Sequence, residues 1–395
     1  MPARLLVAVL LSCFSAAALA EDFTSPAGAG SAQPHLAATA NGSLLLSWTE
    51  PAKDGASALR FATLTNGKWS AAKTIVTRKD FFINWADFPS IAADEKGVLY
   101  THWLQKSADG GKYAYDVWIA TSRDNGATWS APRVLHADGK KSEHGFVSLE
   151  PLPGGGMGAL WLDGREMGGG EGHDAHGEMQ ARFAKIAADG SIGEETLLDS
   201  RVCECCSTGM TLAKSGLIAV YRDRSPEEIR DIAFVRQVDG AWTKPAVVAP
   251  DNWKITGCPV NGPRIDSHEQ FVGAAWFTGS EDKPKVRVAF SPNSGRSWTA
   301  PMQIDSGAPI GRVDLLMLED NTAMVTWVEA TGSSAKIVTR RVMNGGWNGP
   351  VTTIATTATA RASGFPRSAS TGDHAYFAWT DPASKKVKVA RLALK

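Results

Sequence analysis

The sequence predicts an all-β protein, a β-propeller of four-stranded antiparallel blades. The first observation is a repeat: seven apolar segments end in an aromatic residue, at intervals of 55, 58, 60, 55, 51 and 52 residues. This period suits one four-stranded blade with long loops. The second observation is that no segment keeps a 3.6-residue apolar period, so helices are not expected. The seven aromatic residues are Trp48, Trp103, Trp161, Tyr221, Trp276, Trp327 and Trp379.

Each repeat has the same internal order. A short apolar segment such as residues 89–93 comes first, and the aromatic-ended strand follows it. An alternating strand such as residues 286–290 comes third, and a turn leads to the fourth strand. In five repeats that turn carries another tryptophan: Trp69, Trp129, Trp242, Trp298 and Trp347. The repeat thus accounts for eleven of the fourteen tryptophans, which we interpret as packing residues rather than ligand-stacking residues.

The two ends of the repeat region are expected to meet. The seventh repeat stops at Lys395 after its third strand. Residues 22–25 can supply the missing fourth strand, because closing the ring removes an exposed sheet edge. The sequence therefore predicts seven blades in a single domain, residues 21–395, with six blades as the alternative count.

Residues 1–20 have the features of a signal peptide. Arg4 gives a positive start, residues 5–11 are apolar, and an A-x-A cleavage pattern ends at Ala20. We expect cleavage there and a secreted or periplasmic protein, with lipid attachment at Cys13 as the alternative. No later segment reaches the roughly 18 apolar residues of a membrane-spanning helix, so no membrane span is predicted.

The charge balance narrows the class of partner. Lys plus Arg and Asp plus Glu are equal at 41 each, whereas nucleic acid and anionic membrane surfaces select proteins with a basic excess. Hydrophobic residues make up 43% of the chain, enough for a large core. We therefore expect no nucleic-acid partner. We also expect the protein to be a monomer.

Two turns carry a recognisable pattern. Residues 122–129 read SRDNGATW, which matches S-x-D-x-G-x-T-W, and residues 291–298 read SPNSGRSW, a degenerate copy. In such a turn the Asp accepts backbone N–H bonds, the glycine takes a positive φ, and the Trp packs beneath. These turns resemble the aspartate boxes of sialidases and related propellers, and the repeat extends the resemblance over nearly all of the mature chain.

The resemblance implies a sialidase-like propeller fold. The box itself is a structural turn far from the catalytic face in that family, so it does not indicate an activity. Sialidases use three arginines for the substrate carboxylate, a Tyr nucleophile with a Glu partner, and an Asp acid/base. They also have a Phe/Tyr-Arg-Ile-Pro segment near the N-terminus, which only residues 365–367, Phe-Pro-Arg, distantly resemble here. Tyr221 occupies the repeated aromatic position, so we expect it in the core.

Charged, thiol and imidazole side chains occur in two kinds of loop: those that enter the innermost strand of a blade and those that leave its second strand. A propeller places both kinds of loop on one face. This convergence predicts a pocket for an acidic sugar or glycan. Paired carboxylates perform glycoside hydrolysis, and the candidates are Asp87, Asp163 and Asp223. Arginine matches a carboxylate with its planar fork. The candidate substrate-binding residues are Arg165, Arg222, Arg224, Arg312, Arg367 and Trp85, with Trp253 as a further ligand contact. The alternative for the charged segment 221–231 is self-paired surface salt bridges.

The four cysteines of the mature chain lie in two loops that enter blades four and five: Cys203, Cys205, Cys206 and Cys258. In an exported protein they suggest disulfides, with Cys203 or Cys205 bonded to Cys258. Alternatively, their thiolates bind copper or zinc, with His173 and His176 as added ligands. Redox exchange at the C-x-C-C run is the third possibility.

Two function classes follow. The first is an exported sialidase-like glycoside hydrolase, or a degenerate relative that only binds an acidic glycan. The second is a cell-envelope metal-binding or redox module built on the cysteines. A protein-interaction propeller is a further alternative.

Overall fold

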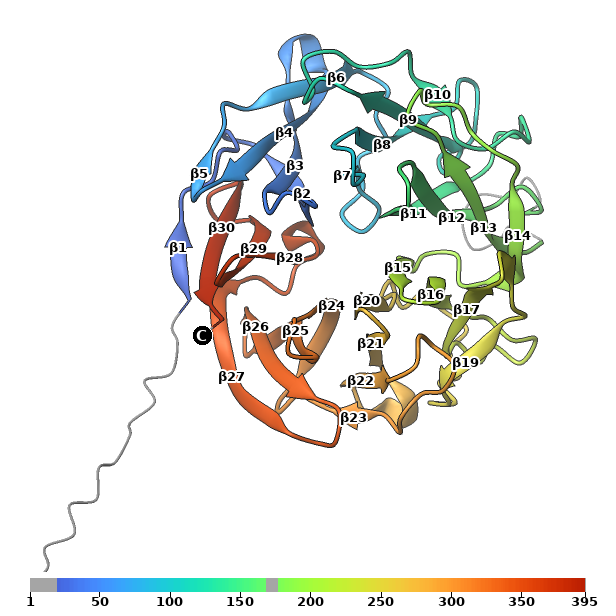
Figure 1. The fold of residues 1–395 in the computed structure, drawn as a ribbon, viewed down its shortest axis with the longest axis vertical. Coiled ribbons are helices and arrows are strands. Elements are labelled where there is room, and N and C mark those ends of the chain that lie inside the picture. The colour runs from blue at the N-terminus through green and yellow to red at the C-terminus, as the bar shows by residue number, and fades with distance from the viewer. Residues whose placement is uncertain (1–19, 168–176, 395) are drawn as a thin grey trace, which may run out of the picture.

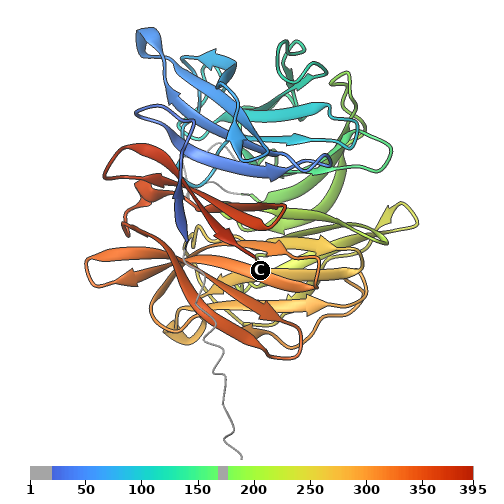
Figure 2. The ribbon, with the colours of Figure 1, turned by 60° about the vertical axis from the view of Figure 1, so that its left-hand side comes forward.

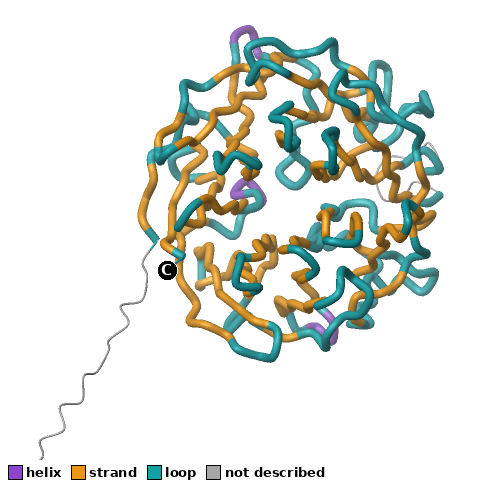
Figure 3. Tube along the Cα trace, in the orientation of Figure 1, coloured by secondary structure: helices purple, strands orange, loops and turns teal. Residues whose placement is uncertain are grey.

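The computed structural model describes residues 20–167 and 177–394. These residues form seven antiparallel sheets arranged around a central axis (Figure 1), so the predicted seven-bladed β-propeller is confirmed and the alternative of six is wrong. Strands and loops make up almost all of the described chain, and the helices in it are short 3₁₀ turns (Figure 3). None of the described helices is long and apolar enough to cross a membrane.

The blades follow the chain in order. Blade 1 contains β2 (Ala32–Ala38), β3 (Leu44–Pro51), η1 (Lys53–Gly55), β4 (Ser57–Thr65), β5 (Lys68–Trp69) and β6 (Lys73–Arg78). Blade 2 contains β7 (Ser90–Ala93), β8 (Leu99–Lys106), β9 (Tyr115–Ser122) and β10 (Arg133–Val134). Blade 3 contains β11 (His144–Pro151), β12 (Met157–Asp163), β13 (Met179–Ile186) and β14 (Thr196–Val202). Blade 4 contains β15 (Gly209–Ala213), β16 (Gly216–Arg222), β17 (Ile232–Val238), β18 (Ala241–Trp242) and β19 (Ala246–Ala249).

The remaining three blades complete the ring. Blade 5 contains β20 (Arg264–His268), β21 (Phe271–Thr278), η3 (Ser280–Asp282), β22 (Lys285–Ser291) and β23 (Met302–Gln303). Blade 6 contains β24 (Pro309–Met317), β25 (Thr322–Thr331), β26 (Ser334–Met343) and β27 (Asn348–Thr357). Blade 7 contains η4 (Arg361–Ser363), β28 (Arg367–Thr371), β29 (His374–Asp381) and β30 (Lys386–Ala393), together with β1 (Glu21–Phe23) from the start of the domain.

The predicted ring closure is confirmed. β1 pairs antiparallel with β30, with Glu21 opposite Arg391 and Phe23 opposite Val389. Phe23 also stacks edge-on against Tyr376, with ring centroids 5.4 Å apart. Figure 2 shows the red strands of blade 7 between the blue strands of blade 1 and the orange strands of blade 6. Pairing β1 with the last strand therefore covers the sheet edge that β30 would otherwise expose.

The repeated aromatic residues form the core, as predicted. All seven are at most 2% exposed. Several of the indole N–H groups donate to an acid two residues later, as from Trp48 to Glu50 at 2.7 Å and from Trp161 to Asp163 at 2.7 Å. This pairing satisfies a buried donor that would otherwise cost free energy. One tryptophan departs from the packing interpretation: Trp347 is 49% exposed.

The two box-like turns have the predicted internal bonding. In the first, Asp124 accepts the Thr128 N–H at 2.9 Å, Gly126 has φ +74°, and Trp129 packs edge-on against Phe61. In the second, the Asn293 side chain accepts the Ser297 N–H at 2.9 Å in the same way. An amide oxygen thus replaces the carboxylate, because the turn needs an acceptor rather than a charge.

Buried carboxylates tie successive blades together around the axis. Each one accepts a backbone N–H from the innermost strand of the next blade. The pairs are Asp87 to Phe146 at 2.8 Å, Glu150 to Leu212 at 2.9 Å, Asp266 to Met317 at 2.7 Å and Asp314 to Ser368 at 2.6 Å. These four acids line an axial cavity of about 380 Å³. The pattern fixes the blades relative to one another, and with them the loops that build the site.

Candidate functional site

A second cavity, of about 320 Å³, lies among loops that enter the innermost strands of blades 2 to 5. Trp85 precedes β7, Glu143 precedes β11, and Glu204 precedes β15. Arg224 and Arg230 come from the loop between β16 and β17, and Arg361 comes from η4 before β28. The cavity walls therefore combine polar and charged side chains from five of the seven blades.

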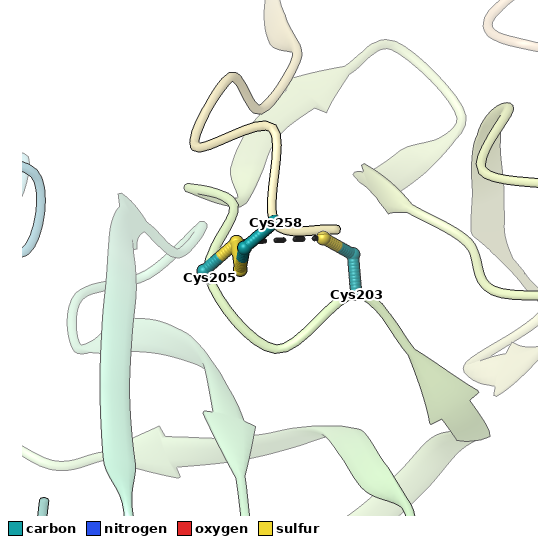
Figure 4. Close-up of side chains that lie close together, drawn as sticks. All are labelled: Cys203, Cys205 and Cys258. Carbon is teal, nitrogen blue, oxygen red and sulfur yellow. Dashed lines mark hydrogen bonds between the residues drawn. A yellow bond between two sulfur atoms is a disulfide. The ribbon is translucent and has the colours of Figure 1, made fainter. Parts of the chain in front are cut away.

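A disulfide joins two walls of this cavity. Cys205, before β15, is bonded to Cys258, before β20, with 6.1 Å between their Cα atoms (Figure 4). Both residues line the cavity. Of the two disulfide pairings predicted, the structure contains the one through Cys205. Cys203 and Cys206 are buried free thiols.

Two arginines and two glutamates form an ion-pair network along one wall. Arg230 donates to Glu204 and to Glu228, each at 2.9 Å. Arg224 donates to Glu228 at 2.8 Å and also pairs with Glu204. The segment 221–231 is therefore partly self-paired through Glu228, as the alternative for it proposed. Its arginines nevertheless reach the cavity, where they hold the carboxylate of Glu204 from the neighbouring loop.

Arg361 and the Trp85 indole also line the cavity, and the buried Arg312 lies next to them. Arg312 and Arg361 lie over the Trp85 ring, at 5.1 and 5.8 Å from its centroid. Burial, and then the charge of Arg361, lower the pKa of Arg312 to about 10. Among the described residues, Arg361 has no carboxylate partner. Arg361 therefore presents a positive charge at the rim that no described carboxylate neutralises, which favours an anionic ligand.

Glu143, Tyr115 and Asp87 form a buried proton-sharing group. The Tyr115 hydroxyl lies 3.0 Å from Asp87 Oδ2 and 3.0 Å from Glu143 Oε1. A phenol has one hydrogen to donate, so both contacts are hydrogen bonds only when one of the carboxyl groups carries a proton of its own. The three groups together therefore hold a proton that can reach the cavity through Glu143.

The pKa values agree with that geometry. Burial raises the pKa of Glu143 to about 8, with added repulsion from Asp87 and Glu204, although its bond to Tyr115 opposes the rise. Burial also raises the pKa of Asp87 to about 7. Because Glu143 lines the cavity and is the weaker acid, it is the protonated group that faces a ligand at neutral pH.

Several residues predicted for the site do not reach this cavity. Asp163 is fully buried, where it accepts from the Trp161 indole and from Arg165 Nη2, each at 2.7 Å. Arg165 also pairs with Glu195 at 2.7 Å. These residues form a network at the carboxyl end of β12. Asp163 takes part in it because the acid two residues after the repeated tryptophan accepts the indole N–H.

The inner arginines act as ties between loops. Arg222 is 1% exposed and donates to the carbonyl oxygens of Asn261, Arg230 and Phe277. Arg312 donates to carbonyl oxygens of the 359–364 loop, and Arg367 pairs with Asp314 at 3.3 Å. Arg222 and Arg312 are thus committed to protein acceptors. The Nε of Arg367 has no hydrogen-bond partner among the described residues, but Arg367 lines the axial cavity and not this one.

The remaining predicted residues divide between the cavity and the core. Trp85 and Arg224 line the cavity. Asp223 is not among the residues that line it, and burial raises its pKa to about 6. Asp87 reaches it only through Tyr115. Trp253 is 8% exposed, and Arg222 lies over its ring, so it belongs to the core. His173 and His176 lie outside the described residues.

Four residues that line the cavity are not among the site residues predicted from the sequence: Glu143, Glu204, Arg230 and Arg361. Glu143 and Glu204 lie in loops that enter innermost strands, and the sequence predicts such loops on this face. Glu143 precedes His144, and Glu204 lies between Cys203 and Cys205. Selecting them required knowing which acids are not already bonded to an indole or a backbone N–H. That information exists only in the folded arrangement.

Solved structures share the fold at low sequence identity. The Hadza microbial sialidase Hz136 is 13% identical with a TM-score of 0.53, over 86% of this chain and 73% of that one. The NanB sialidase from Streptococcus pneumoniae is 11% identical with a TM-score of 0.52, over 89% and 83%. The polysaccharide lyase Uly1 is 8% identical with a TM-score of 0.54, over 92% and 90%. At these identities the likeness supports a sialidase-like propeller as a fold.

No protein-family model matches the chain, and no curated protein matches it.

Proposed function

We propose that the protein binds an acidic glycan in the 320 Å³ cavity and hydrolyses a glycosidic bond there, with Glu143 as the general acid. The observation that carries this proposal is a carboxyl group with a pKa of about 8 that faces a cavity lined by three guanidinium groups. A proton at Glu143 can be given to the departing sugar oxygen, which is the step that a glycosidase must catalyse.

Glu204 is the second carboxyl group of the proposal. Hydrogen bonds from Arg230 and Arg224 fix its carboxylate at the cavity wall. Its charge is one of the causes that raise the pKa of Glu143, which places the two acids in each other's field. Two carboxyl groups that line one cavity can divide the acid and the base or nucleophile roles.

Arg361 and Trp85 are proposed to hold the sugar. The guanidinium of Arg361, which pairs with no carboxylate of the described residues, can take the substrate carboxylate in a two-pronged hydrogen bond. The Trp85 ring lies next to it and offers an apolar face to a sugar ring. The sialidases and the lyase that share the fold act on glycans according to their names, which is consistent with this assignment by analogy of fold alone.

The test combines turnover and binding on fluorogenic acidic and neutral glycosides and on free acidic oligosaccharides. Glu143→Gln should lower kcat by about 10² to 10⁴-fold with binding retained, because general acid catalysis contributes that much. Arg361→Ala should weaken the binding of acidic ligands about tenfold or more and leave neutral ligands unaffected. Arg296→Ala, an exposed arginine of the second box-like turn, is the matched control and should change neither.

The outcomes separate the two forms of the proposal. Binding of acidic glycans that depends on Arg361, without turnover of any glycoside, would reduce the protein to a glycan-binding relative. Absence of both binding and turnover across the panel would contradict the proposal.

Export also remains a proposal: cleavage after Ala20, or alternatively lipid attachment at Cys13. The mass of the mature N-terminal peptide distinguishes the two.

Thiolate metal binding is the second candidate function. The sulfur atoms of Cys203, Cys205 and Cys258 lie within 4.8 Å of one another, which suits copper or zinc. Because Cys205 and Cys258 are bonded to each other here, such a site requires the reduced protein. Metal analysis of protein isolated with and without reductant tests it, and an absence of copper and zinc from both would exclude it.

A further inference from the structure

The free thiols stand directly beside the disulfide of the cavity wall. Cys203 Sγ lies 3.0 Å from Cys206 Sγ and 3.9 Å from Cys205 Sγ. Figure 4 shows the Cys203 side chain pointing from its own strand end toward the Cys205–Cys258 bond. One attacking sulfur, one target disulfide and one resolving sulfur are therefore gathered in one place.

The surroundings of Cys203 favour its thiolate. Arg230 Nη1 donates to Cys203 Sγ at 3.3 Å. Burial alone would raise the pKa of Cys203, but the bond from Cys206 and the charge of Arg230 outweigh it and lower the pKa to about 7. Burial raises the pKa of Cys206. A thiolate with a pKa near the ambient pH is the best attacking group in disulfide exchange.

The spacing of the cysteines provides a second place for the disulfide. Cys203 and Cys206 are separated by two residues, the C-x-x-C spacing that closes readily into a disulfide in redox proteins. Cys205 and Cys258 are 53 residues apart and belong to different blades. The same four sulfur atoms can thus be bonded within one loop or between two loops.

We propose that the four cysteines form an intramolecular thiol–disulfide exchange centre, which moves the disulfide between the loop-bridging Cys205–Cys258 pair and the local Cys203–Cys206 pair. Cys203 and Cys206 are each 1% exposed, so an outside thiol or disulfide does not reach them in the closed fold. Exchange among the four neighbours needs no such access.

The exchange takes two balanced steps. In the first, the Cys203 thiolate attacks Cys205 Sγ: the 203–205 bond forms, the 205–258 bond breaks, and Cys258 leaves as a thiolate that takes up the proton lost by Cys203. In the second, Cys206 loses its proton and attacks Cys203 Sγ: the 203–206 bond forms, the 203–205 bond breaks, and Cys205 leaves and is protonated. One disulfide and two thiols are present throughout, so no oxidant or reductant is consumed.

The exchange changes the cavity. Cys205 and Cys258 both line it, and their bond is the covalent link between its blade 4 and blade 5 walls. Moving the disulfide to Cys203–Cys206 removes the covalent link between the 256–261 loop and the loop of Glu204, while the hydrogen bonds from Arg222 to the Asn261 carbonyl oxygen remain. The expected consequence for glycan binding rests on the proposed function, whereas the exchange itself does not.

The experiment maps the disulfide in full-length protein isolated without reductant. Samples are held between pH 5 and 9, quenched with acid, unfolded, alkylated and digested under non-reducing conditions. Alkylated Cys258 reports the local isomer, because in the bridged isomer that sulfur is blocked. We expect two free thiols among Cys203, Cys205, Cys206 and Cys258 at every pH, and a fraction of alkylated Cys258 that grows with time. Its rate should be higher at pH 9 than at pH 5, because the thiolate and not the thiol attacks a disulfide.

Two variants identify the attacking and resolving sulfurs. Cys203→Ser should abolish the alkylation of Cys258. Cys206→Ser should instead retain it, with the bond trapped between Cys203 and Cys205. The proposal is overturned when Cys258 stays blocked at all pH values in the wild type, or when Cys258 of Cys203→Ser is alkylated as fast as in the wild type. It is overturned equally by a chain with no free thiols, or by stoichiometric copper or zinc on the cysteines. None of these readings depends on glycan turnover, so a failure here is distinct from a failure of the proposed function.

Discussion

Tyr115→Phe tests the proton-sharing group directly. The substitution removes one hydroxyl and leaves the ring, so Asp87 Oδ2 and Glu143 Oε1 each lose a bond of 3.0 Å. Asp87 keeps the Phe146 N–H at its other oxygen. A buried polar group that loses its partner costs about 1–3 kcal/mol. Asp87 keeps a second partner and is counted at about 1 kcal/mol, so the free energy of unfolding should fall by about 2–4 kcal/mol. With an unfolding entropy of about 2.1 cal/mol/K per residue, the melting temperature of a domain this large should fall by about 3–5 °C.

The same change should alter the pH dependence of activity. The Tyr115 bond lowers the pKa of Glu143 against the larger effect of burial, which raises it to about 8. A bond worth about 1–1.5 kcal/mol more to the carboxylate than to the acid corresponds to about one pH unit. A general acid loses activity as the pH rises through its pKa. The falling limb of kcat/KM in Tyr115→Phe should therefore lie about one pH unit higher than in the wild type.

The assay pairs calorimetry with kcat/KM from pH 5 to 10. Tyr113→Phe is the control: Tyr113 is 37% exposed at the cavity, and its hydroxyl bonds to none of the described residues, so its melting temperature should equal that of the wild type. A falling limb of Tyr115→Phe that stays in place or moves to lower pH would refute the reasoning about Glu143. An unchanged melting temperature would refute the assigned hydrogen bonds.

Two further predictions concern the scaffold. Gly126 and Gly67 have nearly the same φ, +74° and +73°, but a Cβ at Gly126 would overlap the Phe61 ring while Gly67 faces open space. Gly126→Ala should therefore destabilise the fold by about 1–3 kcal/mol more than Gly67→Ala in urea unfolding, and equal effects would contradict the packing described. Burial raises the pKa of Glu150, which accepts the Leu212 N–H, to about 8. Because this folded pKa lies above the unfolded one, its contribution to stability is complete at low pH and is lost as the pH rises toward 8. Glu150→Gln should flatten the fall in unfolding free energy between about pH 5 and 8, a slope of up to about 1.4 kcal/mol per pH unit, and an unchanged slope would contradict it.

The sequence by itself determined the scaffold. A period near 55 residues, an aromatic residue at each strand end and a final repeat one strand short were sufficient to predict seven blades and the pairing of β1 with β30. These features are local or periodic, so they can be recognised in the sequence without knowledge of the fold. The loop rule of the propeller also indicated the face on which Trp85, Arg224 and the cysteines gather.

Only the tertiary structure decided which polar residues are free to act. Asp163 and Arg222 have the residue types of a glycosidase site. Asp163, however, accepts a hydrogen bond from an indole, and Arg222 donates to three carbonyl oxygens. Glu143 has an unremarkable sequence context, and its raised pKa depends on burial and on the charges of Asp87 and Glu204, which come from other blades. Likewise, the choice of Cys205 rather than Cys203 as the partner of Cys258 depends on how two loops meet. Hydrogen-bond partners, burial and local field come from residues distant in the chain, which is why they are fixed by the fold and not by the local sequence pattern.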